Sequence, residues 1–194
     1  MNLPNTLTLL RLFLIPVFVV VFYLPFRGSH AAAALIFFFA AITDWLDGYL
    51  ARRLKQTSLL GEFLDPVADK IMVAVVLVLL LQQDPTVLLA LLTAVIIGRE
   101  IAVSALREWM AELGARRRVA VSVLGKVKTT LQMLALILML YRVPVGGIDT
   151  YALGLRLLYL AALLTLWSMF VYLVAAWPQL RAGGKNEKTK LKAN

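Results

Sequence analysis

The fold of this chain is decided by one stretch, Asp44-Trp45-Leu46-Asp47-Gly48-Tyr49-Leu50-Ala51-Arg52, which is followed after eight residues by Gly61, Asp65 and Asp69. Its four aspartates lie inside two apolar segments that are long enough to cross a bilayer. A single aspartate at the centre of a membrane helix costs about 2.5–3.5 kcal/mol. Something must therefore neutralise these groups, and the candidates are metal ions or nearby arginines and lysines.

Helical geometry places the first two acids on one stripe. At about 100° per residue, Asp44, Asp47, Gly48 and Ala51 share one face of a helix, with Arg52 at its margin. Arg52 is the one well-placed cation that this segment offers. The two small residues leave room for a large polar ligand close to the backbone.

The second pair of acids also shares a stripe, because Asp65 and Asp69 are four residues apart. Lys70 points elsewhere on the same helix, and Gly61 again leaves room beside the backbone. One cation against four acids favours hard divalent metal ions with carboxylate ligands.

The composition is that of a membrane protein. The chain has 194 residues, of which 61% are hydrophobic, and a mean hydropathy of +0.84. It contains no cysteine, which excludes disulfides and thiolate metal sites. The formal charge of +9 points to cytoplasmic loops and anionic membrane lipids as partners, and not to nucleic acid.

The hydropathy pattern predicts an all-α polytopic membrane protein with one bundle of six transmembrane helices. Residues 1–181 form a single domain in this interpretation, and the basic segment 182–194 is predicted to be disordered. Most lysines and arginines lie at one set of helix ends, which predicts cytoplasmic termini and a polar cavity open to the cytoplasm. The predicted spans are 7–24, 32–52, 61–82, 86–107, 119–141 and 152–177.

The spacing Asp-x2-Asp-Gly-x2-Ala-Arg-x8-Gly-x3-Asp-x3-Asp resembles the signature of the CDP-alcohol phosphotransferases, and every position of that pattern is filled. The resemblance implies two divalent metal ions, Mg or Mn, and a homodimer in a bacterial inner membrane. Asp44 and Asp65 would be ligands shared by both ions. Asp47 would bind the first ion and Asp69 the second, and Asp69 would also be the general base.

The same resemblance implies a set of contacts with CDP-diacylglycerol. The matching positions are Asn5, Thr8, Gly48, Ala51, Arg52, Ser58 and Gly61. Two alternatives remain open at this stage. Asn5 can simply cap a helix while Arg11 extends to the membrane surface, and Ser58 can be an ordinary loop serine.

Four basic residues could bind a phosphate on the acceptor: Arg99, Arg107, Lys126 and Lys128. The stretches around them, 97–102, 104–111 and 125–130, resemble family members that use glycerol 3-phosphate. The implied reaction transfers a phosphatidyl group from CDP-diacylglycerol to that acceptor and releases CMP. Serine, inositol phosphate or phosphatidylglycerol as acceptor, a divalent-cation transporter, and a purely topological role for the basic residues are the alternatives.

Overall fold

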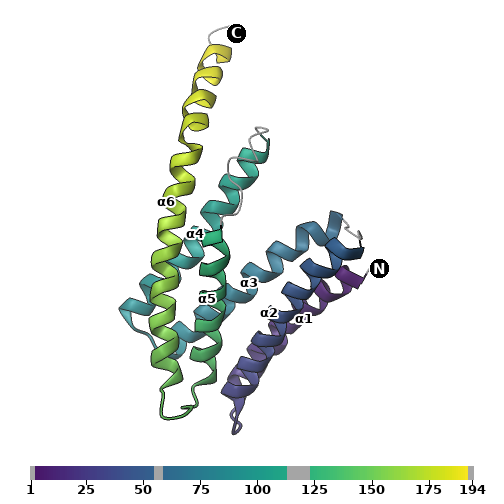
Figure 1. The fold of residues 1–194 in the computed structure, drawn as a ribbon, viewed down its shortest axis with the longest axis vertical. Coiled ribbons are helices and arrows are strands. Elements are labelled where there is room, and N and C mark those ends of the chain that lie inside the picture. Colours follow the sequence, from purple (N-terminus) through teal and green to yellow (C-terminus); the bar gives the residue numbers. More distant parts are fainter. Residues whose placement is uncertain (1–2, 55–58, 113–122, 192–194) are drawn as a thin grey trace.

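The computed structural model describes residues 3–54, 59–112 and 123–191, and within these residues the chain forms six α-helices and no strand (Figure 1). The helices are α1 (Leu3–Tyr23), α2 (Ser29–Leu54), α3 (Leu59–Gln83), α4 (Val87–Glu112), α5 (Val123–Tyr141) and α6 (Thr150–Leu191). The all-α class is confirmed.

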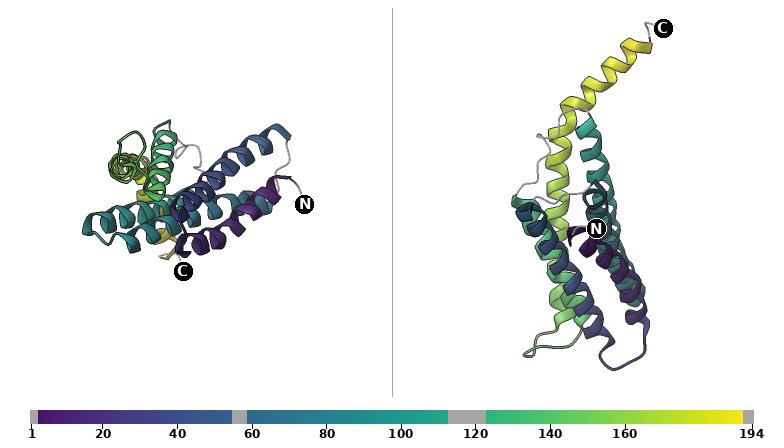
Figure 2. Two further views of the ribbon diagram at one scale, coloured as in Figure 1. Left: turned by 90° about the horizontal axis from the view of Figure 1, so that it is seen from below. Right: turned by 90° about the vertical axis from the view of Figure 1, so that its right-hand side faces the viewer.

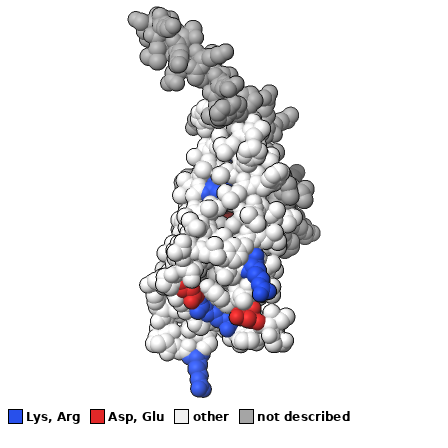
Figure 3. Space-filling view, turned by 90° about the vertical axis from the view of Figure 1, so that its left-hand side faces the viewer, with Lys and Arg blue, Asp and Glu red and all other residues white. Residues whose placement is uncertain are grey.

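Within the described parts of the chain, three helices contain segments that are long and apolar enough to cross a membrane: Thr6–Tyr23, Val87–Met110 and Thr150–Val174. Two shorter apolar segments, Ser29–Asp44 and Val127–Tyr141, belong to α2 and α5. Their charged ends shorten the apolar part of each helix. The face in Figure 3 is mostly free of charge, with most of its charged side chains near one end. The chain is a membrane-embedded protein.

The longest helix extends further than the hydropathy predicts. The expected span ends at residue 177, but α6 continues to Leu191, into the basic segment for which the sequence favours disorder (Figure 1). Lysine and glutamate are good helix formers, so a helical backbone can continue beyond the apolar part.

By their contacts, the six helices form a closed ring in the order α1, α2, α5, α6, α4, α3, and α3 also contacts α2 and α5. Figure 2 shows the helices from two further sides. Sequence neighbours thus form two hairpins, α1–α2 and α5–α6, which meet through α2 and α5. The main core cluster receives at least one fully buried side chain from every helix: Phe18, Phe37, Leu77, Ile96, Leu136 and Leu158.

The loops at the lower end of Figure 1 are joined by polar contacts. Asp149 caps α6, since its carboxylate accepts a hydrogen bond from the Ala152 amide at 3.1 Å. Arg142 forms an ion pair with Asp84 and lies over the Tyr151 ring, 4.7 Å from the ring centroid. The α3–α4 and α5–α6 loops are therefore held together.

The α5–α6 hairpin depends on a close approach at Gly154. A Cβ atom built there would lie 2.7 Å from the Ala135 carbonyl oxygen and 2.8 Å from Met139 Cγ. A backbone atom cannot move aside as a flexible side chain can, so any larger residue must push the two helices apart.

We expect Gly154→Ala to lower the free energy of unfolding by about 1–3 kcal/mol, the usual cost of overpacking a core. The measurement is the thermal unfolding midpoint of the detergent-solubilised protein. Gly98→Ala is the matched control, because a Cβ at Gly98 in α4 meets nothing within 4 Å. Equal midpoints for the two variants would contradict the close approach.

Candidate functional site

Helix α1 joins the two halves of the aspartate motif. Arg11 Nη1 donates a hydrogen bond of 2.8 Å to Asp44 Oδ1 on α2. Thr8, one turn earlier on α1, donates through its hydroxyl to Asp65 Oδ1 on α3. Since Thr8 and Arg11 lie on one face of α1, Asp44 of α2 and Asp65 of α3 both point toward that face of α1.

Asp44 has a cationic partner on another helix, which the motif spacing does not reveal. Arg11 is 1% exposed and paired with Asp44, so it does not extend to the membrane surface as a lipid-facing arginine would. Arg11 is 33 residues from Asp44 in sequence, so the helical periodicity of the segment around Asp44 cannot reveal this ion pair. Asp44 itself remains 43% exposed, so the pair lies at the edge of the polar region.

Asp69 completes the convergence of the motif. Its carboxylate is close enough to interact with the charges of Asp44 and Arg11, and with those of Glu100 and Lys70. Asp69 is thus near both the motif acid Asp44 and Glu100 of α4, while Lys70 is its sequence neighbour on α3. The motif and α4 therefore contribute polar groups to one region of the structure.

The remaining motif positions are described only by their backbone. Asp47, Gly48, Ala51 and Arg52 lie on α2 downstream of Asp44, as the stripe analysis requires, but their side chains are outside the described residues. The same holds for the side chain of Asn5 on α1. Ser58 lies outside the described residues altogether, and Gly61 is buried near the start of α3.

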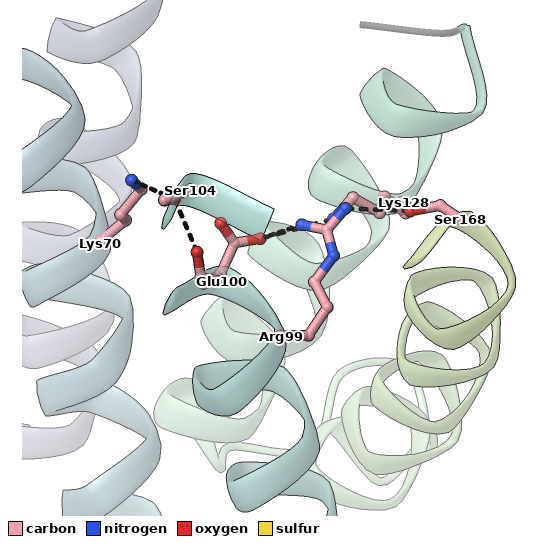
Figure 4. Close-up of polar contacts among 6 residues, drawn as sticks. All are labelled: Lys70, Arg99, Glu100, Ser104, Lys128 and Ser168. Carbon is pink, nitrogen blue, oxygen red and sulfur yellow. Dashed lines mark hydrogen bonds and ion pairs between the residues drawn. The ribbon is translucent and has the colours of Figure 1, made fainter. Parts of the chain in front are cut away.

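A buried charge cluster joins α4, α5 and α6 (Figure 4). Glu100 on α4 accepts hydrogen bonds through Oε1 from Arg99 and, at 3.4 Å, from Lys128 on α5. Arg99 also donates through Nη2 to Ser168 Oγ on α6 at 2.9 Å. Arg99 and Lys128 are each about 5% exposed, so one carboxylate offsets two buried cations.

A cavity of about 280 Å³ lies between α3, α4 and α5, beside this cluster. Its polar wall is formed by Asp69, Lys70, Glu100, Thr129 and Gln132. The rest of the wall is apolar, with isoleucines of α3 and α4 and Met133 of α5. A small polar molecule in this cavity would meet Asp69 on one side and the charges of α4 on the other.

The predicted phosphate-binding residues do not all reach this cavity. Arg99 and Lys128 contact Glu100 behind the cavity wall. Arg107 is exposed on α4, and the side chain of Lys126 lies outside the described residues. Lys70, which the stripe analysis set aside, instead lines the cavity and donates to Ser104 Oγ on α4 at 2.5 Å.

The donor set suits hard divalent cations, which prefer carboxylate oxygens. The contacts of Asp44 with Arg11 and of Asp65 with Thr8 each use one carboxylate oxygen, Oδ1. Within the described residues, no three acids or histidines are arranged to hold one ion, and the side chain of Asp47 is not among them. The chemistry therefore fits, and the coordination itself stays a prediction.

Comparisons with known proteins agree with the motif. The family model for CDP-alcohol phosphatidyltransferase matches residues 1–177. A Pseudomonas fluorescens protein named CDP-diacylglycerol–glycerol-3-phosphate 3-phosphatidyltransferase is 55% identical over 188 residues, 96% of each chain. A protein of the same name from Pectobacterium atrosepticum is 57% identical over 175 residues, 90% of this chain and 94% of the relative.

We expect Arg11→Met to destabilise the protein by about 1–3 kcal/mol, because it leaves the Asp44 carboxylate without its cation in a partly buried setting. The measurement is the thermal midpoint without added metal. Arg27→Met, in an exposed loop, is the control for loss of positive charge. The double variant Arg11→Met/Asp44→Asn should recover part of the loss, and no recovery would contradict a direct interaction.

Proposed function

The chain belongs to the CDP-alcohol phosphatidyltransferase family, and from that premise we propose that it transfers the phosphatidyl group of CDP-diacylglycerol to glycerol 3-phosphate. The products are phosphatidylglycerophosphate and CMP, so the enzyme serves the synthesis of anionic phospholipids. Relatives that are 54–57% identical over nearly their whole length carry this activity in their names. The observation in this chain that best supports it is that α1 contacts both Asp44 and Asp65, while Asp69 of the same motif lines a mixed polar cavity.

Asp69 is the proposed general base. It faces the cavity, so it can accept the proton of the primary hydroxyl of glycerol 3-phosphate. The hydroxyl oxygen then attacks the phosphorus that carries the diacylglycerol. A new P–O bond forms, the bond to the CMP oxygen breaks, and CMP leaves as an anion. Such a displacement depends mainly on positioning and charge, which the chain's own side chains can supply.

The four motif acids would hold two divalent ions. Asp44 and Asp65 would be shared ligands, while Asp47 would bind the first ion and Asp69 the second. When bound, such ions offset the charge of the pyrophosphate and of the developing transition state. Thr8 and Arg11 are proposed to hold Asp65 and Asp44 in place from the α1 side, through the contacts already described.

The nucleotide lipid is proposed to bind along the start of α1 and the end of α2. The positions concerned are Asn5, Thr8, Gly48, Ala51, Arg52, Ser58 and Gly61. Gly48 and Ala51 have almost no side chain, so the cytidine and pyrophosphate can approach the α2 backbone. The acyl chains would stay in the bilayer while the head group enters the polar region.

We further propose that all six helices span the bacterial inner membrane, with both termini and the cavity on the cytoplasmic side. The basic residues support this orientation, since they gather at the helix ends that carry the motif. A homodimer is expected for this family. A divalent-cation transporter, which four acids alone would also allow, is disfavoured because the family consists of transferases.

The deciding experiment supplies the detergent-solubilised protein with CDP-diacylglycerol and one acceptor at a time, and measures CMP release. We expect release with glycerol 3-phosphate, its loss with EDTA, and recovery with Mg²⁺ or Mn²⁺. Release only with serine, inositol phosphate or phosphatidylglycerol would replace the proposed acceptor. Full activity in EDTA would contradict the metal proposal.

Asp69→Asn is expected to lower the rate of CMP release by about 10²–10⁴-fold, because the variant cannot accept the proton. The Kd for CDP-diacylglycerol should stay within about threefold of the wild-type value. That is less than the change in Kd expected from losing one hydrogen bond to a charged group. Both are measured on the same preparation, and Gln82→Ala, at the other end of α3, is the control. A normal rate would refute the assignment of the base.

A further inference from the structure

The cavity beside Asp69 has a cation that the motif does not explain. Among the cavity-lining residues that the structure describes, Lys70 is the one cation. Arg99 and Lys128 are turned toward Glu100 instead, and both are buried against it. A ligand in the cavity would therefore meet the ammonium group of Lys70 without first breaking a buried ion pair.

The contact that holds Lys70 is with a neutral group. Its Nζ donates to Ser104 Oγ at 2.5 Å, and Ser104 in turn donates to the Glu100 carbonyl oxygen at 2.6 Å (Figure 4). The serine hydrogen is thus directed at its own helix, and a lone pair of its oxygen faces the lysine. Among the described residues Lys70 forms no ion pair, and an ammonium group has three donors.

We propose that Lys70 binds the phosphate group of the acceptor, and that Ser104 positions its ammonium for this contact. The assignment rests on the proposed function and deepens it by naming the residue that selects a phosphorylated acceptor. A charge-assisted hydrogen bond to phosphate is stronger than one between neutral groups, and the isoleucines around Lys70 reduce its screening by water.

The surrounding charges favour an anion at this place. Glu100 also lines the cavity, but Arg99 and Lys128 more than offset its single negative charge. The wall that faces Lys70 therefore repels a phosphate much less than a lone carboxylate would.

Adjacent positions on α3 give the cavity two chemically distinct contacts. Asp69 and Lys70 both line it, one able to accept the proton of a hydroxyl and the other able to hold a phosphate. Glycerol 3-phosphate carries both groups, whereas glycerol carries only hydroxyls. Lys70 is accordingly a specificity-determining residue, and its removal should lower the preference for glycerol 3-phosphate over glycerol.

The test compares Lys70→Gln with wild type in the CMP-release assay, using glycerol 3-phosphate and glycerol as acceptors. We expect the KM for glycerol 3-phosphate to rise about ten- to a hundredfold, the effect of losing a charge-assisted hydrogen bond. The KM for CDP-diacylglycerol should change far less, and the ratio of the CMP-release rates with glycerol 3-phosphate and with glycerol should fall. Inhibition by inorganic phosphate should weaken in parallel with the KM.

Two further variants separate binding from structure. Lys70→Arg keeps the charge and should retain most of the preference for glycerol 3-phosphate over glycerol. Ser104→Ala frees the ammonium and should raise the KM for glycerol 3-phosphate about threefold, the loss expected from one neutral hydrogen bond. If Lys70→Gln does not fold, Ser104→Ala decides the question. Arg156→Gln, an exposed residue near the start of α6, is the control for loss of one positive charge.

The outcomes distinguish this assignment from the function on which it rests. If wild type releases no CMP with glycerol 3-phosphate, the proposed function fails. If wild type is active but Lys70→Gln keeps its KM for that acceptor, only the role of Lys70 is overturned. An equal rise in the KM values for both substrates would also overturn it, because it would show a general disturbance of the site.

Discussion

The contacts of α1 with two acidic helices are the constraint on which the rest of this structure depends. Carboxylates are expensive inside an apolar bundle unless a partner offsets them. Arg11 and Thr8 provide such partners from one face of α1, to Asp44 and to Asp65. Because the acids belong to different helices, satisfying them also fixes where α2 and α3 lie around α1. Arg11 and Thr8 thus both offset the two carboxylates and position the helices that carry them.

A second charge cluster provides the other side of the polar region. Glu100 joins Lys128 of α5 to Arg99 of α4, and Arg99 reaches Ser168 of α6. These bonds bring polar groups of three helices together beside the cavity that Asp69 enters. Asp69 and Glu100 both line this cavity, and in the proposed mechanism a substrate with both a hydroxyl and a phosphate would bind there. Phosphoryl transfer needs this kind of positioning more than it needs covalent help from the protein.

Sequence reasoning was most successful where the signal lies within one helix. The stripes of Asp44 and of Asp65 with Asp69 follow from helical periodicity, and the structure brings the described members together. It was least successful where the partner comes from another helix. Arg11 looked like a surface arginine, and Lys70 appeared to point away from the site. Neither contact can be found from spacing, because each depends on which helix packs alongside.

By itself, the sequence determined the helical class, the membrane setting, the positions of the motif acids and the family, since all of these follow from local composition, period and spacing. Only the tertiary structure decided which cation pairs with Asp44 and that Glu100 forms ion pairs with Arg99 and Lys128. It also decided that Lys70 lines the cavity. The physical reason is that ion pairs and cavities form between helices. Their partners are set by the order of the helices around the ring, which no single segment encodes.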